Sequence, residues 1–293
     1  MNANTQPVPV SVLIPVKNEA ANLPRCLASV AWAAEIFVVD SASTDGTVEI
    51  AERLGAKVVQ FEYRGGWPKK KEWSLRNLPF ANEWVLLLDA DEVMPAGAAE
   101  EIRALIANGP AKCAGYWINR RFFFLGQWLR HAYFPNWNLR LVRHRQARFE
   151  RLAEGDTQSG DNEVHEHLLV DGETGRLASL MDHYAFPTVA AFVEKHNRYS
   201  NWEAAVALQT AGAQNAAELQ KGGVGARRRL KGWARRLPCR PTLRFLYVYV
   251  WQRGFLDGRA GWYFARLHAY YEFLTVVKTY ELRREREGGR PPD

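Results

Sequence analysis

Short apolar runs and amphipathic stretches alternate along the first third of the chain. Runs rich in Val, Ile, Leu and Phe, at residues 10–16, 35–41, 57–61 and 84–89, have the composition of strands buried on both faces of a parallel sheet. Helical spacing separates them, with apolar residues three or four apart in residues 20–32 and capping residues followed by an amphipathic pattern in residues 43–56. The pattern predicts an α/β fold with a Rossmann-like, mostly parallel central sheet and helices on both faces.

The pattern changes after residue 112. Residues 114–126, 136–144 and 165–172 are predicted to form antiparallel strands or hairpins, and residues 188–211 a helix. Residues 221–240 contain eight Lys and Arg and no acid, which predicts a basic loop, and we expect the last ten residues to fray. We therefore expect one domain over residues 1–220, with halves at 9–110 and 111–220, and a basic, aromatic helical extension over residues 221–293.

Polar residues follow the predicted strands at the edge where parallel sheets bind ligands. PVKNE, DSASTDG and DADE come after the first, second and fourth strands. Asp89, Asp91 and Glu92 are three carboxylates at the end of a buried strand, so they require a cationic partner. On an extended chain Asp89 and Asp91 share a face and can bind one divalent cation, although a solvated acidic loop is the alternative.

Composition narrows the class of protein. The 293 residues, 47% of them hydrophobic, are enough for one large core or for a core with a smaller appendage. Cys26, Cys113 and Cys239 form no CxxC pair, which argues against a structural zinc site and favours a reducing compartment, so we expect a cytoplasmic protein. No secretory signal and no run approaching the roughly 18 apolar residues of a membrane-spanning helix are expected.

Charge is concentrated near the C-terminus. Residues 1–220 hold 22 Lys and Arg against 26 Asp and Glu, whereas residues 221–293 hold 17 against 6. A helical apolar stripe follows the basic loop; it consists of Tyr263, Leu267, Tyr270, Leu274 and Val277, widened by Trp262, Phe264, Tyr271 and Phe273. Together they predict peripheral attachment to an anionic membrane surface, with packing of the stripe against its own domain as the alternative.

Three stretches occur together in a diagnostic order: SVLIPVKNEAANLPRCLASV, FVVDSASTDGTVEIAERLGAKV and WVLLLDADE. Over residues 9–110 the chain resembles the nucleotide-sugar-binding half of GT-A glycosyltransferases of family 2. VHEHLLVDG, DHYAF and RFLYVYVWQRGFLDGRAG resemble the bacterial subgroup that includes lipopolysaccharide-core β-1,4-glucosyltransferases. The resemblance implies inverting sugar transfer from a nucleoside diphosphate sugar, UDP-glucose in that subgroup, to a cell-surface glycan or lipid-linked saccharide.

The resemblance also assigns residues to the donor site: Pro15, Val16, Asn18, Glu19, Asp40, Ser43, Asp45, Lys71 and Asp89. Asp40 is expected to accept a hydrogen bond from the base, and Asp89 to face the ribose or the metal. Asp45 is equally well explained as a helix cap, and Lys71 as part of a solvated Lys69–Lys71 triplet.

The same resemblance implies a metal site. Asp91 is expected to bind Mg²⁺ or Mn²⁺ to the diphosphate, since both cations suit oxygen ligands and neutralise a leaving diphosphate. His183 stands where relatives supply a late histidine to the metal, although a hydrogen-bonded core histidine is the alternative.

Inverting transfer needs a base that takes the proton of the acceptor hydroxyl. In DNEVHEHL the alternation places Glu166 between Val164 and Leu168, where desolvation raises its proton affinity, and we predict it as the base. Asp161 is the second candidate, and a structural ion pair the alternative for Glu166. HExxH would need histidine where Leu169 stands, which excludes a zinc protease.

Three other classes of protein fit these residues less well. A nucleotidyltransferase would carry a Gly-rich loop after the first strand, and PVKNEAANL contains no glycine. A nucleic-acid-binding protein would explain RRRLKGWARR but leaves the acidic motif unexplained, so nucleic acid is not an expected partner. A catalytically inactive glycan-binding protein would not need the full set of carboxylates.

Overall fold

The computed structural model describes residues 6–110, 112–151, 167–212 and 239–288. They form two compact units. The first contains the chain up to Phe123 together with Phe134–Ala185, and the second contains Phe124–Tyr133 and the chain from Phe186 onward. The predicted domain boundary at residue 220 and most of the predicted basic loop, residues 221–238, lie outside the described residues.

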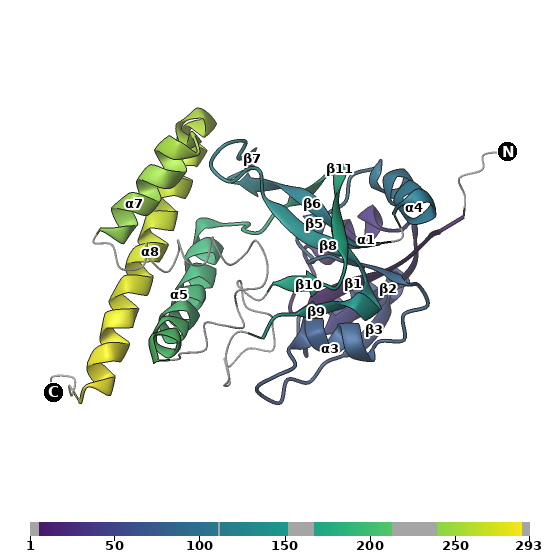
Figure 1. The fold of residues 1–293 in the computed structure, drawn as a ribbon, viewed down its shortest axis with the longest axis horizontal. Coiled ribbons are helices and arrows are strands. Elements are labelled where there is room, and N and C mark those ends of the chain that lie inside the picture. The colour runs from purple at the N-terminus through teal and green to yellow at the C-terminus, as the bar shows by residue number, and fades with distance from the viewer. Residues whose placement is uncertain (1–5, 111, 152–166, 213–238, 289–293) are drawn as a thin grey trace. The chain divides into compact units, whose positions relative to one another are not determined.

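The first unit is built on a curved central sheet (Figure 1). Its strand order is β3-β2-β1-β4-β8-β6-β11-β5. The strands β1 (Val8–Val16), β2 (Ala33–Asp40), β3 (Lys57–Gln60) and β4 (Trp84–Leu87) are parallel to one another, with helices α1 (Leu23–Ser29), α2 (Thr47–Arg53) and α3 (Lys70–Asn77) between them. The predicted α/β fold and its four strands are confirmed, with ends that differ by one or two residues.

Alternation along β1 explains why both faces of the sheet are covered. Val10, Val12 and Ile14 face a core that also contains apolar residues of α1, α2 and α4 (Ala98–Asn108). Leu13 faces a second core, which includes Leu75 of α3. Because both faces are buried, a continuous apolar run is what such a strand requires.

The second half of this unit adds antiparallel strands. Strand β8 (Trp137–Arg143) pairs antiparallel with both β4 and β6 (Cys113–Phe124), and β9 (Ala147–Phe149) pairs antiparallel with β10 (Leu168–Val170). The strands predicted in residues 114–126, 136–144 and 165–172 correspond to β6, β8 and β10, whereas β9 was not predicted. Strand β11 (Glu173–His183) was not predicted, because ETGRLASLMDH contains no apolar run or strict alternation. It runs parallel to β6, and its end pairs with the two-residue strand β5 (Glu92–Val93).

The second unit is mainly helical. Helix α5 (Val189–Gly212) and helix α7 (Arg240–Leu246) both pack against α8 (Gly258–Arg286), as Figure 1 shows. Between α7 and α8 lie a π-helical turn, η3 (Tyr247–Trp251), and a 3₁₀ turn, η4 (Gly254–Asp257). The unit also holds the short strand β7 (Gln127–Trp128). The helix predicted over residues 188–211 is confirmed, and so is the helical spacing predicted from Tyr263 to Val277.

Buried Asp257 ties residues 124–133 to the start of α8. Its carboxylate accepts hydrogen bonds from the backbone N–H groups of Arg130, His131 and Ala132 at 2.9, 3.0 and 2.8 Å. These three backbone donors satisfy the hydrogen-bonding capacity of a carboxylate that is buried away from water. This explains why a loop distant in sequence belongs to the helical unit.

Helix α8 divides into a packed face and an exposed face. Phe264 and His268 are buried, and Phe264 packs on Phe124 and Phe192 with ring centroids 5.5 and 6.4 Å away. The inclusion of Phe264 in the predicted outer stripe is therefore wrong, since its ring is part of the core of this unit. No helix among the described residues is long and apolar enough to span a membrane.

Candidate active site

The loops that follow β1 and β2 are joined to each other at one edge of the sheet. Asn18 has the left-handed φ of 56° that asparagine tolerates, and its Oδ1 accepts a hydrogen bond from the Thr44 backbone N–H at 2.8 Å. Its own N–H donates to Ser43 Oγ at 2.8 Å. The two loops therefore form one rim. It contains the predicted residues Asn18, Glu19, Ser43 and Asp45, and the predicted residues Pro15, Val16 and Asp40 lie at the strand ends that lead into it.

The carboxylates of Asp40 and Asp45 hold this rim together by accepting hydrogen bonds from it. Asp40 is fully buried, accepts the Ser43 N–H at 3.0 Å and bonds to the Ser43 hydroxyl. Asp45 accepts N–H groups from Thr47 at 3.2 Å and from Ala20 at 3.1 Å, and the Thr47 hydroxyl contributes to lowering its pKa. Asp45 thus bonds to the first residue of α2 and to the loop after β1, while the N-cap residue of α2 is Gly46. Its role in the donor site stays a prediction.

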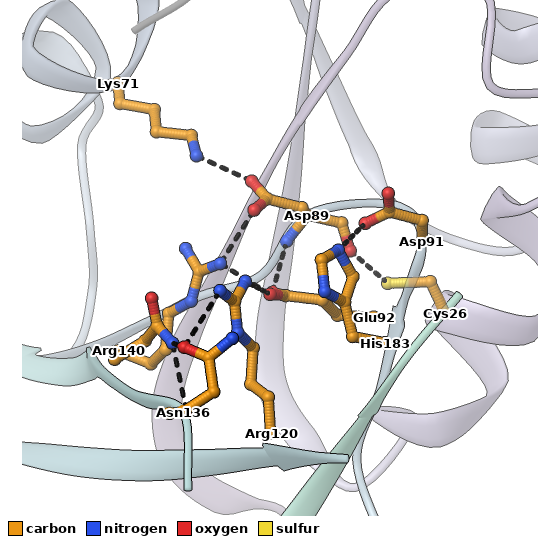
Figure 2. Close-up of polar contacts among 10 residues, drawn as sticks. Cys26, Lys71, Asp89, Asp91, Glu92, Arg120, Asn136, Arg140 and His183 are labelled. Atoms are coloured by element: carbon orange, nitrogen blue, oxygen red, sulfur yellow. Dashed lines mark hydrogen bonds and ion pairs between the residues drawn. The ribbon is translucent and has the colours of Figure 1, made fainter. Parts of the chain in front are cut away.

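The acidic motif after β4 forms a turn. The strand ends at Leu87, and the Glu92 N–H donates to the Asp89 carbonyl at 2.9 Å. The extended conformation expected for Asp89 to Asp91 is therefore wrong, because this bond closes the chain on itself. As a result the two aspartates have different partners (Figure 2).

Asp89 lies between two cations. Lys71 Nζ is 2.6 Å from Asp89 Oδ1, and Arg140 Nη2 is 2.7 Å from Oδ2, so the carboxylate is held from two sides (Figure 2). Partial burial would raise the pKa of Asp89, but the charges of Arg140 and Lys71 hold it well below its usual range. Asp89 is ionised at neutral pH, and its ion pair brings the predicted donor residue Lys71 to the acidic turn.

Glu92 is the buried carboxylate of the acidic turn. Its side chain is fully buried, with Oε1 lying 2.5 Å from Arg140 and 3.0 Å from Arg120, while Oε2 accepts the Asp89 N–H at 2.9 Å. Arg140 and Arg120 are the cationic partners of Glu92, and Arg140 is also a partner of Asp89, but the sequence did not identify them. The available signal was the arginine within the apolar run NLRLVR of β8.

The lysine triplet is not solvated. Lys69 and Lys70 are buried, and Lys70 Nζ donates to the Val16 carbonyl at 2.8 Å. The alternative of a solvated triplet is therefore wrong. Lys70 secures the end of β1, while Lys71 reaches the acidic turn.

Asp91 and His183 approach each other through the pairing of β5 and β11. His183 is opposite Glu92 in that pairing, and the Tyr184 N–H donates to the Asp91 carbonyl at 2.9 Å. His183 Nε2 lies 3.4 Å from Asp91 Oδ1. Two ligands of one octahedral cation with bonds of about 2.1 Å lie roughly 3 Å apart, so this pair fits a shared divalent ion.

No group of three or more His, Cys, Asp and Glu side chains suited to a metal occurs within the described residues. A cation held here would therefore draw its other ligands from a bound phosphate or water. This donor set suits Mg²⁺ or Mn²⁺, which commonly retain water and bind substrate phosphates.

Cys26 is a buried residue that contacts the acidic turn. Its Sγ is 3.6 Å from the Asp89 carbonyl (Figure 2). Burial raises the pKa of the Cys26 thiol, and the carboxylates of Glu92, Asp91 and Asp89 raise it further. The thiol stays protonated, so Cys26 is a packing residue rather than a nucleophile.

The predicted base Glu166 and its alternative Asp161 lie outside the described residues. The neighbouring structure is described: the Glu150 N–H donates to the His167 carbonyl at 2.9 Å, and β9 pairs with β10 just beyond. Buried Glu72 of α3 accepts the Phe149 N–H at 2.7 Å, which holds β9 against the donor half. The assignment of Glu166 stays a prediction.

Replacing Arg140 with Met should destabilise the first unit by about 3–5 kcal/mol, since it leaves buried Glu92 with one cation fewer. Chemical denaturation measures this change. Arg64, whose pair with Glu62 is exposed, is the control, and R64M should cost about 0–1 kcal/mol. An R140M loss no larger than that of R64M would contradict the structural role of Arg140.

The stability of the first unit should also depend on pH through Asp89. Because the pKa of Asp89 is lower in the folded chain than in the unfolded chain, its contribution to the free energy of unfolding is complete above the unfolded pKa of about 4. That contribution is lost as pH falls through the folded pKa.

Comparisons with known proteins show which family and which proteins this chain is similar to. The family model described as "Glycosyl transferase family 2" matches residues 11–164, more than half of the chain. A lipopolysaccharide core biosynthesis glycosyltransferase, LpsC of Rhizobium meliloti, is 27% identical over 94% of this chain and 93% of its own length. The uncharacterized glycosyltransferase RT0209 of Rickettsia typhi is 28% identical over 93% of this chain and 87% of its own length. Among solved structures, S. aureus TarS residues 1–349 in complex with UDP-GlcNAc matches with a TM-score of 0.43 and 16% identity, covering 94% of this chain and 92% of that one.

Proposed function

This chain belongs to glycosyl transferase family 2, and we propose that it is an inverting, metal-dependent enzyme that transfers a sugar from a nucleoside diphosphate sugar to a hydroxyl of a bacterial cell-surface glycan. The donor is UDP-linked, with UDP-glucose as the first candidate, and the acceptor is of the lipopolysaccharide-core type. The observation that carries the proposal is the acidic turn after β4, where Asp89 meets two cations and Asp91 meets His183.

The donor site is proposed at the edge formed by the ends of β1, β2 and β4. Asn18 and Ser43 present polar groups on the rim, and Pro15, Val16 and Glu19 precede or form the same loop. Asp40 supports Ser43 from beneath and is the proposed partner of the base. Ligands of open α/β sheets bind at this edge, which supports placing the nucleoside there.

The diphosphate is proposed to lie against Lys71, Asp91 and His183. Asp91 and His183 would hold Mg²⁺ or Mn²⁺, which when bound would neutralise the charge of the leaving diphosphate. Lys71 is 2.6 Å from Asp89, so its ammonium is already directed into the acidic turn and can contact a phosphate oxygen. Arg140 and Glu92 keep Asp89 in place by contacts that do not involve substrate.

Sugar transfer is proposed to proceed in one displacement. The acceptor oxygen bonds to C1 of the sugar while the bond from C1 to the diphosphate oxygen breaks, and the hydroxyl proton passes to the carboxylate of Glu166. The nucleoside diphosphate leaves with the bonding electrons. This assigns proton transfer to Glu166 and charge neutralisation to the groups around Asp91.

We also propose a cytoplasmic enzyme that works at an anionic membrane surface. Cys26, Cys113 and Cys239 are free thiols, as in reduced compartments. Lipid-linked and lipopolysaccharide-type acceptors are found at membranes, and the basic surplus near the C-terminus complements anionic lipid.

A thermal-shift panel tests the donor. UDP-, GDP-, CMP- and dTDP-sugars are compared with and without Mn²⁺, and a ligand at about 100 times its dissociation constant should stabilise the fold by ~2.7 kcal/mol. Stabilisation by one class of nucleotide sugar, dependent on Mn²⁺, is the expected result. Salt-sensitive binding of RNA with no response to any nucleotide sugar would instead favour the nucleic-acid-binding alternative.

A further inference from the structure

Exposed apolar side chains are concentrated in the second unit. Of the large hydrophobic residues that are exposed in the described part of the chain, all except Leu54 belong to this unit. Trp251 is 80% exposed at the end of η3, and Phe255 and Leu256 are about half exposed in η4. A concentration of exposed apolar side chains in one unit favours an interaction site there.

A groove lies within this unit beside α8. Its volume is about 630 Å³, and its lining is largely apolar: Leu125, Val189, Pro241, Tyr263, Leu267 and Phe273. Arg266 is the charged residue of the lining. Its guanidinium lies 5.7 Å from the centre of the Trp262 ring and 6.0 Å from that of Phe245, so it is held near the aromatic surface.

The positive charge of this surface indicates which kind of partner binds it. Arg253, Arg259 and Arg266 are exposed, and no ion pair with an acid is formed by any of them within the described residues. Arginine beside exposed Trp and Tyr is the composition of a headgroup-level membrane contact, in which aromatic rings enter the interface and cations meet lipid phosphates. A water-soluble partner with a complementary apolar face would not require the excess of positive charge.

We propose that residues 243–280 form a membrane-binding surface in which η3 and η4 insert Trp251, Phe255 and Leu256 at headgroup depth. The groove beside α8 takes an acyl chain of an anionic phospholipid, and Arg266 binds its phosphate. This deepens the membrane location in the proposed function by naming the segment that makes the contact, and it does not depend on the sugar-transfer chemistry.

Vesicle sedimentation of the full-length chain tests the proposal. Vesicles of phosphatidylcholine and phosphatidylglycerol in equal parts are compared with pure phosphatidylcholine. The wild type should sediment with the anionic vesicles and less with the neutral ones, and R253Q, R259Q and R266Q should each lower partitioning about fivefold. R53Q makes the same charge change at an exposed position of the first unit and should bind as the wild type does.

A second measurement locates the contact. Cys239 is exposed and the other two cysteines are buried, so an environment-sensitive thiol probe reports from the start of α7 next to the groove. Brominated acyl chains should quench this probe in the wild type, and W251S combined with L256S should weaken binding while R53Q leaves it unchanged.

An enzyme that stays in the supernatant, or variants that bind as tightly as the wild type, would overturn the proposal. A concentration-dependent dimer that the W251S and L256S changes dissociate, with no vesicle binding, would assign the surface to a second copy. Sugar-nucleotide stabilisation and transfer to a soluble acceptor, measured without vesicles, should be unchanged in these variants. If the wild type shows neither nucleotide-sugar stabilisation nor sugar transfer, that result counts against the proposed function, and the result on membrane binding still holds.

Discussion

Replacing Asp91 with Asn should reduce sugar transfer by at least ~10³-fold, a loss of several kcal/mol of transition-state stabilisation. The amide keeps the shape of the side chain but removes the charge that, with His183 at 3.4 Å, would hold the cation. Chelation of the wild type should produce the same loss, and Mg²⁺ or Mn²⁺ should restore it. Initial rates of nucleoside diphosphate release measure both effects.

The matched control is D171N, the same change at an exposed carboxylate paired with Arg148. Its rate should equal that of the wild type. Calorimetric titration with Mn²⁺ in the presence of the nucleoside diphosphate supplies a readout other than turnover, and D91N should bind the cation more weakly while its unfolding curve is retained. Transfer by D91N at the wild-type rate would remove Asp91 from the metal site.

Replacing Glu166 with Gln should lower the turnover number by ~10² to 10⁴-fold while the affinity for the donor persists. Gln is isosteric with Glu and cannot take the acceptor proton. The measurements are steady-state transfer to the acceptor and thermal stabilisation by the nucleotide sugar. A raised KM for the donor with little change in kcat would make Glu166 a donor ligand instead.

Glu163 provides a control from the same segment, since the alternation predicted from the sequence would place it on the opposite face from Glu166. E163Q should retain the wild-type rate. If E166Q is active and D161N is not, the base is Asp161. If E166Q loses stability as well as turnover, the structural ion pair is the better explanation.

The local pattern of apolar and polar residues was sufficient to predict much of the secondary structure of the first unit. The apolar runs at β1 to β4 predict buried strands because burial on both faces demands uninterrupted hydrophobic side chains. Strand β11 escaped prediction since its residues alternate irregularly, and its partners β6 and β5 are distant in sequence. The helical spacing of α8 was evident, but which side faced a core depended on α5 and Phe124.

The sequence by itself determined the α/β fold, the acidic motif at the end of β4 and the need for a cation beside it, because strand burial and charge repulsion act on neighbouring residues. Only the tertiary structure decided which cations these are. Arg140 is 51 residues from Asp89, and it reaches the acidic turn because β8 pairs with β4. Likewise His183 meets Asp91 through the pairing of β11 with β5. Strand pairing between distant segments leaves no periodic pattern in the local sequence. The partners of each carboxylate can therefore be identified only from the assembled sheet.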